Sequence, residues 1–112
     1  MTPENAPVEY VDDLTHQDAR EIMAFIGART TDGSPTATAL HVAVLHLHLG
    51  VTDEIPRLGN PFTTEYRSIP ARIRMRTAWN GLVAAAGPWA DHPDYAAARW
   101  RHIDNCDQRP TD

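Results

Sequence analysis

The chain has a single cysteine, Cys106, and no lysine, since all ten of its basic residues are arginine. One cysteine cannot form an internal disulfide, so a reducing cytoplasm is the expected setting and a packed core has to hold the fold. A domain of 112 residues buries roughly two-thirds of its unfolded surface, which is enough for such a core. Arginine in place of lysine, together with abundant alanine, favours a high-G+C bacterial or phage genome.

The sequence also lacks the marks of several functional classes. It has no basic-then-apolar N-terminus of a signal peptide and no apolar run long enough to span a bilayer. There is no glycine-rich phosphate loop, and the only two serines, Ser34 and Ser68, stand where helix N-caps are expected. We therefore expect a cytoplasmic protein with no membrane segment, no cofactor and no catalytic residues of a common type.

The most apolar stretch present is SPTATALHVAVLHLHLG, residues 34–50, which carries three of the six histidines. As a helix it would be capped by Ser34, begin with Pro35 and end before Gly50. It would have two roughly opposite apolar faces, which is typical of a helix buried between neighbours on both sides. One face comprises Ala37, Leu40, Ala43, Val44 and Leu47, and the other comprises Val42, Leu45 and Leu49.

The alternative for residues 40–49 is a β-strand. Apolar residues alternate as far as Val44, and the alternation then slips at Leu45. A strand needs a bulge to repair this slip, whereas a helix needs no repair. The caps and the length of the stretch favour the helix.

Local signals predict further helices on both sides of this stretch. Thr15 and Asp18 form the pattern of a capping box, which starts a first helix. Another helix is expected from about Ile69 to Ala86, because Gly87 and Pro88 would stop it. A last helix is expected from Asp91 or His92 until about Asn105.

The remaining segments carry breakers or charges. Residues 1–13 are expected to form a loose, extended N-terminal tail, residues 51–68 an irregular connection broken by Pro56 and Pro61, and residues 107–112 a C-terminal tail. The sequence thus predicts one all-α domain, residues 1–112, as a small bundle of about four helices around the central helix 34–50.

Charge is unevenly distributed along the chain, whose net charge is −5. Residues 1–56 hold nine acids and two arginines, whereas residues 57–78 hold five arginines and one acid. Arginines and isoleucines of this region form an apolar-plus-basic stripe on the predicted helix 69–86, and such a stripe is typical of a protein interface. The alternative is a solvated face, or pairing of the arginines with the acidic N-terminal half. The candidate interaction surface is Arg67, Ile69, Arg72, Ile73, Arg74 and Arg76.

The same arginine cluster, Arg67 to Arg76, also suggests nucleic-acid binding, because arginine can bind phosphate through two hydrogen bonds. The acidic overall balance argues against it. The letters LGVT at 49–52 resemble the turn of a helix-turn-helix motif, but Pro56 would lie inside the recognition helix.

Metal binding is the third hypothesis, and the histidines give it two candidate pairs. His46 and His48 lie two residues apart and converge only on a strand, whereas His102 and Cys106 are four apart on the predicted last helix. The latter pair also has the spacing of a thiolate and an imidazole, without evident oxyanion donors. The sequence as a whole favours a non-enzymatic protein that binds another protein or itself.

Overall fold

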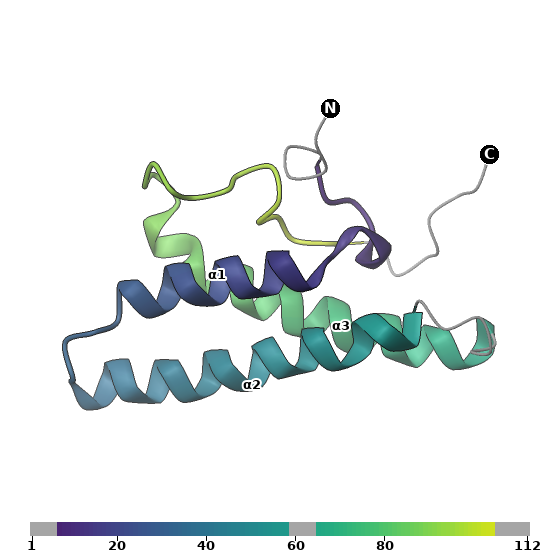
Figure 1. The fold of residues 1–112 in the computed structure, drawn as a ribbon, viewed down its shortest axis with the longest axis horizontal. Coiled ribbons are helices and arrows are strands. Elements are labelled where there is room, and N and C mark those ends of the chain that lie inside the picture. Colours follow the sequence, from purple (N-terminus) through teal and green to yellow (C-terminus); the bar gives the residue numbers. More distant parts are fainter. Residues whose placement is uncertain (1–6, 59–64, 105–112) are drawn as a thin grey trace.

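The computed structural model describes residues 7–58 and 65–104, without the side chains of 53–58 and 65–69. Helix α2 packs most extensively against α3, and α1 lies against both (Figure 1). The all-α prediction is confirmed, with three α-helices rather than four in this part of the chain. The elements are η2 (Val11–Asp13), α1 (His16–Ala28), α2 (Pro35–Leu58), α3 (Glu65–Ala86) and η3 (Gly87–Trp89), where η marks a short 3-10 helix.

The start of α1 follows from its sequence. The hydroxyl of Thr15 accepts a hydrogen bond from the amide of Asp18 at 3.1 Å, and the carboxylate of Asp18 accepts one from the amide of Thr15 at 2.9 Å. This reciprocal pair is the predicted capping box, which satisfies amide groups that the first helical turn leaves without partners.

The start of α2 is equally local. The hydroxyl of Ser34 accepts from the amide of Ala37 at 3.1 Å, and Pro35 is the first helical residue. Just before it, the carboxylate of Asp32 accepts from the amide of Ser34 at 3.0 Å. Hydrogen bonds from Ser34 hold the pKa of Asp32 below its ordinary value, and the bond from the Ser34 amide has a larger effect than the bond from its side chain. The helix excludes the strand alternative for residues 40–49.

Helix α2 does not end at Gly50 as predicted. It continues to Leu58 through Pro56, and α3 begins at Glu65, so the predicted irregular connection over 51–68 was wrong for most of its length. Residues 59–64 lie outside the described residues. The physical reason is that Gly50 is a packing residue: a Cβ atom there would lie 3.1 Å from the Cβ of Ala78 on α3.

The contrast between Gly50 and Gly27 gives a first prediction. A Cβ added at Gly27, in α1, meets nothing within 4 Å, so Gly27→Ala should stabilise the protein by about 0.5–1 kcal/mol through helix propensity. Gly50→Ala should lose that gain and destabilise, because the new methyl group forces α2 away from α3. Thermal unfolding of the two variants should therefore shift in opposite directions from the wild type. Equal shifts would show that the helix contact at Gly50 is not tight.

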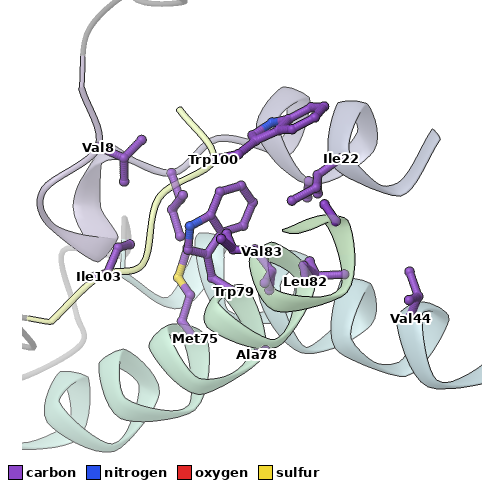
Figure 2. Packing of buried hydrophobic residues seen from close by; sticks show 14 of the residues in the cluster. Val8, Ile22, Val44, Met75, Ala78, Trp79, Leu82, Val83, Trp100 and Ile103 are labelled. Atoms are coloured by element: carbon purple, nitrogen blue, oxygen red, sulfur yellow. The ribbon is translucent and has the colours of Figure 1, made fainter. Parts of the chain in front are cut away.

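The core is built around α3, and it joins α1, one face of α2 and both ends of the described chain. Figure 2 shows Trp79 and Met75 of α3 facing Val8, Trp100 and Ile103, which come from the two ends of the chain. The expectation of a loose tail at 1–13 was therefore wrong for residues 7–13. Their apolar side chains reach the core.

The predicted last helix is also absent. Residues 90–104 form turns and extended chain that run back across α1 and α3 (Figure 1). Their backbone groups are bound by side chains of α3: Trp79 donates to the carbonyl of Arg101 at 2.9 Å, and Asn80 both donates to and accepts from the backbone of Ile103. Groups used in this way are not available for hydrogen bonds within a helix. Among the described helices, none is long and apolar enough to cross a membrane.

Candidate interaction surface

Arg72, at the centre of the predicted basic stripe, lies inside the molecule. Its side chain is buried, and its Nη2 atom lies 2.7 Å from the carboxylate of Asp12. Pairing with the acidic N-terminal half was the alternative interpretation of the cluster, and this ion pair is an instance of it. Arg72 therefore links α3 to η2.

Arg76 also contacts the chain itself. Its guanidinium donates to the carbonyl of Asp104 at 3.1 Å, one turn before Asn80 binds Ile103. Together with the Arg72 ion pair, these contacts attach both ends of the described chain to this face of α3.

Two other members of the predicted surface are exposed. Ile73 has 44% of its surface exposed, and Arg74 is exposed next to it. Arg67 and Ile69 belong to α3, but their side chains lie outside the description. A binding role for Ile73 and Arg74 stays a prediction, on a surface smaller than the one expected from the sequence.

The histidine pairs do not converge. Because residues 40–49 are helical, His46 and His48 point about 200° apart around α2, and His46 is exposed while His48 is half-buried. His102 is exposed, and Cys106 lies outside the described residues. Within residues 7–58 and 65–104, no group of three or more His, Cys, Asp and Glu side chains is arranged to hold a metal ion.

A surface that the sequence did not single out lies on α2. Val42, Leu45 and Leu49, which we call the α2 stripe, are 53%, 46% and 47% exposed. Their spacing of three and four residues places them along one line of the helix. The prediction that this second apolar face would be covered was wrong, because α1 and α3 both pack toward the opposite line, which contains the buried residues Ala37, Val44 and Val51.

The stretch of α2 that carries the stripe contains no formally charged residue. From Pro35 to Thr52 the helix has no Asp, Glu, Lys or Arg, and its polar residues there are threonines and histidines. His41 and His48 lie between the stripe and the buried line, and the Nε2 atom of each is buried with no hydrogen-bond partner among the described residues. Single exposed aliphatic residues are ordinary, whereas an uncharged line of them is typical of a binding site.

A concave feature lies beside α1. An open cleft of about 370 Å³ is lined by residues of α1 and of the returning segment, including Phe25, Arg29 and Trp100. The Arg29 guanidinium lies 3.8 Å from the centre of the Phe25 ring, and its Nη2 atom lies 2.8 Å from Nε2 of His92.

The cleft's polar groups are largely engaged with one another. Arg29 also donates to the carbonyl of Phe25, and the Tyr95 hydroxyl donates to the carbonyl of Trp100 at 3.3 Å. Burial raises the pKa of Tyr95 above its ordinary value. The arrangement packs residues 92–100 onto α1.

The sequence held one signal for the α2 stripe: the absence of charge over residues 35–52. The same absence is equally expected of a fully buried helix, so the number of neighbours had to decide between the two. Comparisons of the chain with protein-family models, with curated proteins and with solved structures gave no match.

Proposed function

We propose that this protein is a non-enzymatic adaptor or regulatory protein that acts by binding another protein through the α2 stripe. The observation that carries the proposal is the exposure of Val42, Leu45 and Leu49 on one line of α2, within the uncharged stretch 35–52. Because about half of each of these three residues is exposed, each gives up roughly half of the ~1.5–3 kcal/mol that full burial of such a side chain contributes. A partner that covers the line recovers this energy, in the manner of a helix seated on an apolar groove or on another helix.

Nucleic acid is the less favoured partner. In the arginine cluster that could bind phosphate, Arg72 forms an ion pair with Asp12, and Arg76 binds a backbone carbonyl. A phosphate track requires several arginines that face solvent together. The α2 stripe, in turn, offers no cation to phosphate.

Photo-crosslinking in cells of the organism that encodes the chain tests the proposal. A photoreactive amino acid at position 45 or 49 should give a covalent adduct with a polypeptide, because both positions would lie inside the interface. The matched controls are positions 77 and 84, which are exposed on the outer face of α3. Nuclease treatment before electrophoresis should leave the adduct unchanged.

The corresponding substitution gives the second prediction. Leu45→Glu should weaken partner binding by at least about 30-fold, since an interface anchor is worth about 2 kcal/mol or more, and it should leave the far-ultraviolet circular dichroism unchanged. Ala84→Glu, at an exposed position of α3, should leave binding intact. Adducts of equal yield at all four positions, or equal binding by both variants, would contradict the proposal.

A further inference from the structure

We infer that the partner seated on the α2 stripe is a second copy of this chain, with the two α2 helices antiparallel about a two-fold axis near Leu45. This inference rests on the proposed function, because it names the occupant of the same surface. It is carried by two properties of α2, which are the order of its exposed residues and the absence of charge around them.

The exposed line of α2 reads nearly the same in both directions. Thr38, Val42, Leu45, Leu49 and Thr52 follow one another at intervals of four, three, four and three residues. A two-fold axis at Leu45 places Val42 of one copy opposite Leu49 of the other, and Thr38 opposite Thr52. Two-fold dimers use the same patch on both copies, so such a patch must be complementary to itself.

The charge distribution also favours a second copy of this chain as the partner. Residues 1–56 carry seven more acids than arginines, so two copies repel one another at most contacts between their N-terminal halves. Residues 35–52 are the exception, since a contact there brings no like charges together. An unrelated partner is usually selected through complementary charges at the rim of the interface, and residues 35–52 have no charged side chain for that purpose. The antiparallel orientation also pairs opposite ends of the two helix dipoles.

The interface is small, and this determines the expected strength. One pair of helices covers less than the roughly 800 Å² per partner that is typical of stable complexes. We therefore expect a dimer with a dissociation constant of about 10–100 μM, which corresponds to a weak association. Sedimentation equilibrium of the purified chain from about 5 to 500 μM covers that range.

The third prediction concerns Leu45 at the axis, where a substitution acts twice in each dimer. Leu45→Asp should raise the dissociation constant at least about 100-fold, because two carboxylates would face one another in a desolvated contact. Ala84→Asp is the control, since it adds the same charge at an exposed residue on the outer face of α3, and it should dimerise as the wild type does. Circular dichroism should show that both variants are folded.

Cysteine cross-linking tests the direction of the helices, in a background where Cys106→Ser removes the natural thiol. Leu45→Cys should form a disulfide with its own copy, because the two positions meet at the axis. Val42→Cys alone should not, because the two Val42 positions would lie about 10 Å apart along the helices, beyond the ~7 Å Cα separation that a disulfide tolerates. A mixture of Val42→Cys and Leu49→Cys chains should give the mixed disulfide.

A monomer up to about 500 μM, or a dimer that Leu45→Asp does not weaken, would overturn the inference. Rapid disulfide formation by Val42→Cys alone would indicate parallel helices and would overturn it as well. The mass of the photo-adduct at position 45 separates this inference from the proposed function. An adduct of any other mass than two copies leaves α2 as a protein-binding surface and excludes the second copy as its occupant.

Discussion

Replacing Arg99 by methionine should lower the free energy of unfolding by about 3–5 kcal/mol. Arg99 and Asp18 are both buried, and the guanidinium binds the carboxylate through two hydrogen bonds, of 3.0 Å from Nε and 2.6 Å from Nη2. The same Nη2 atom donates to the carbonyl of Asp13 at 2.7 Å. Methionine fills the space of the side chain and leaves the Asp18 carboxylate buried without its cation, which is the costly half of breaking a buried pair.

Two further variants make this prediction specific. Arg101→Met removes an exposed arginine two residues away and should change the stability by less than about 0.5 kcal/mol. Asp18→Asn combined with Arg99→Met should cost less than Arg99→Met alone, because asparagine can still cap α1 and buries no charge. The measurement is urea unfolding of the four proteins. A cost for Arg99→Met no larger than that for Arg101→Met would show that the ion pair does not hold the returning segment on α1.

Replacing Trp79 by alanine should also cost about 3–5 kcal/mol. The Trp79 side chain is completely buried at the centre of the α3 core face (Figure 2), and its indole N–H donates to the carbonyl of Arg101 at 2.9 Å. Alanine removes both the packing and the hydrogen bond. Since small domains have only about 5–15 kcal/mol of stability in total, this variant should unfold at a much lower urea concentration.

Trp79→Phe separates the two contributions. Phenylalanine keeps most of the packing and loses the donor, so it should cost about 1–3 kcal/mol. The control is Trp89→Phe, because Trp89 is half-buried in η3; it should lie within about 0.5 kcal/mol of the wild type. The urea midpoint and its slope should be measured for each protein, since an unchanged slope shows that stability and not compactness has changed. Equal costs for both phenylalanine variants would contradict the role given to the indole N–H.

The two predictions concern the same structural feature, which is the attachment of residues 98–104 to the helices. Arg99 binds the start of α1, Trp79 binds the carbonyl of Arg101, and Asn80 binds Ile103. Asp18 and Arg99 are 81 residues apart in the sequence. Ala96, Trp100 and Ile103 have the spacing of one helix face, and periodicity alone does not show that remote side chains bind the backbone of this segment. Trp100 and Ile103 are buried in chain that is not helical.

Part of the predicted interaction surface makes contacts within the chain, for a related reason. The sequence placed the interaction surface on Arg72 and Ile73, because apolar and basic residues alternate there on one face of α3. Asp12, which neutralises Arg72, is 60 residues away. The exposed α2 stripe, by contrast, has the composition of a core helix, so its sequence predicted that it would be buried.

What the sequence by itself determined about this protein is local: the capping box that begins α1, the serine cap that begins α2 and the glycine that ends α3. Each depends on groups within one or two helical turns, so a short window of sequence contains all the interacting atoms. Only the tertiary structure decided which face of α2 is covered, which arginines are paired and whether residues 90–104 are helical. These outcomes depend on how many neighbours each surface receives, and the neighbours come from distant parts of the chain.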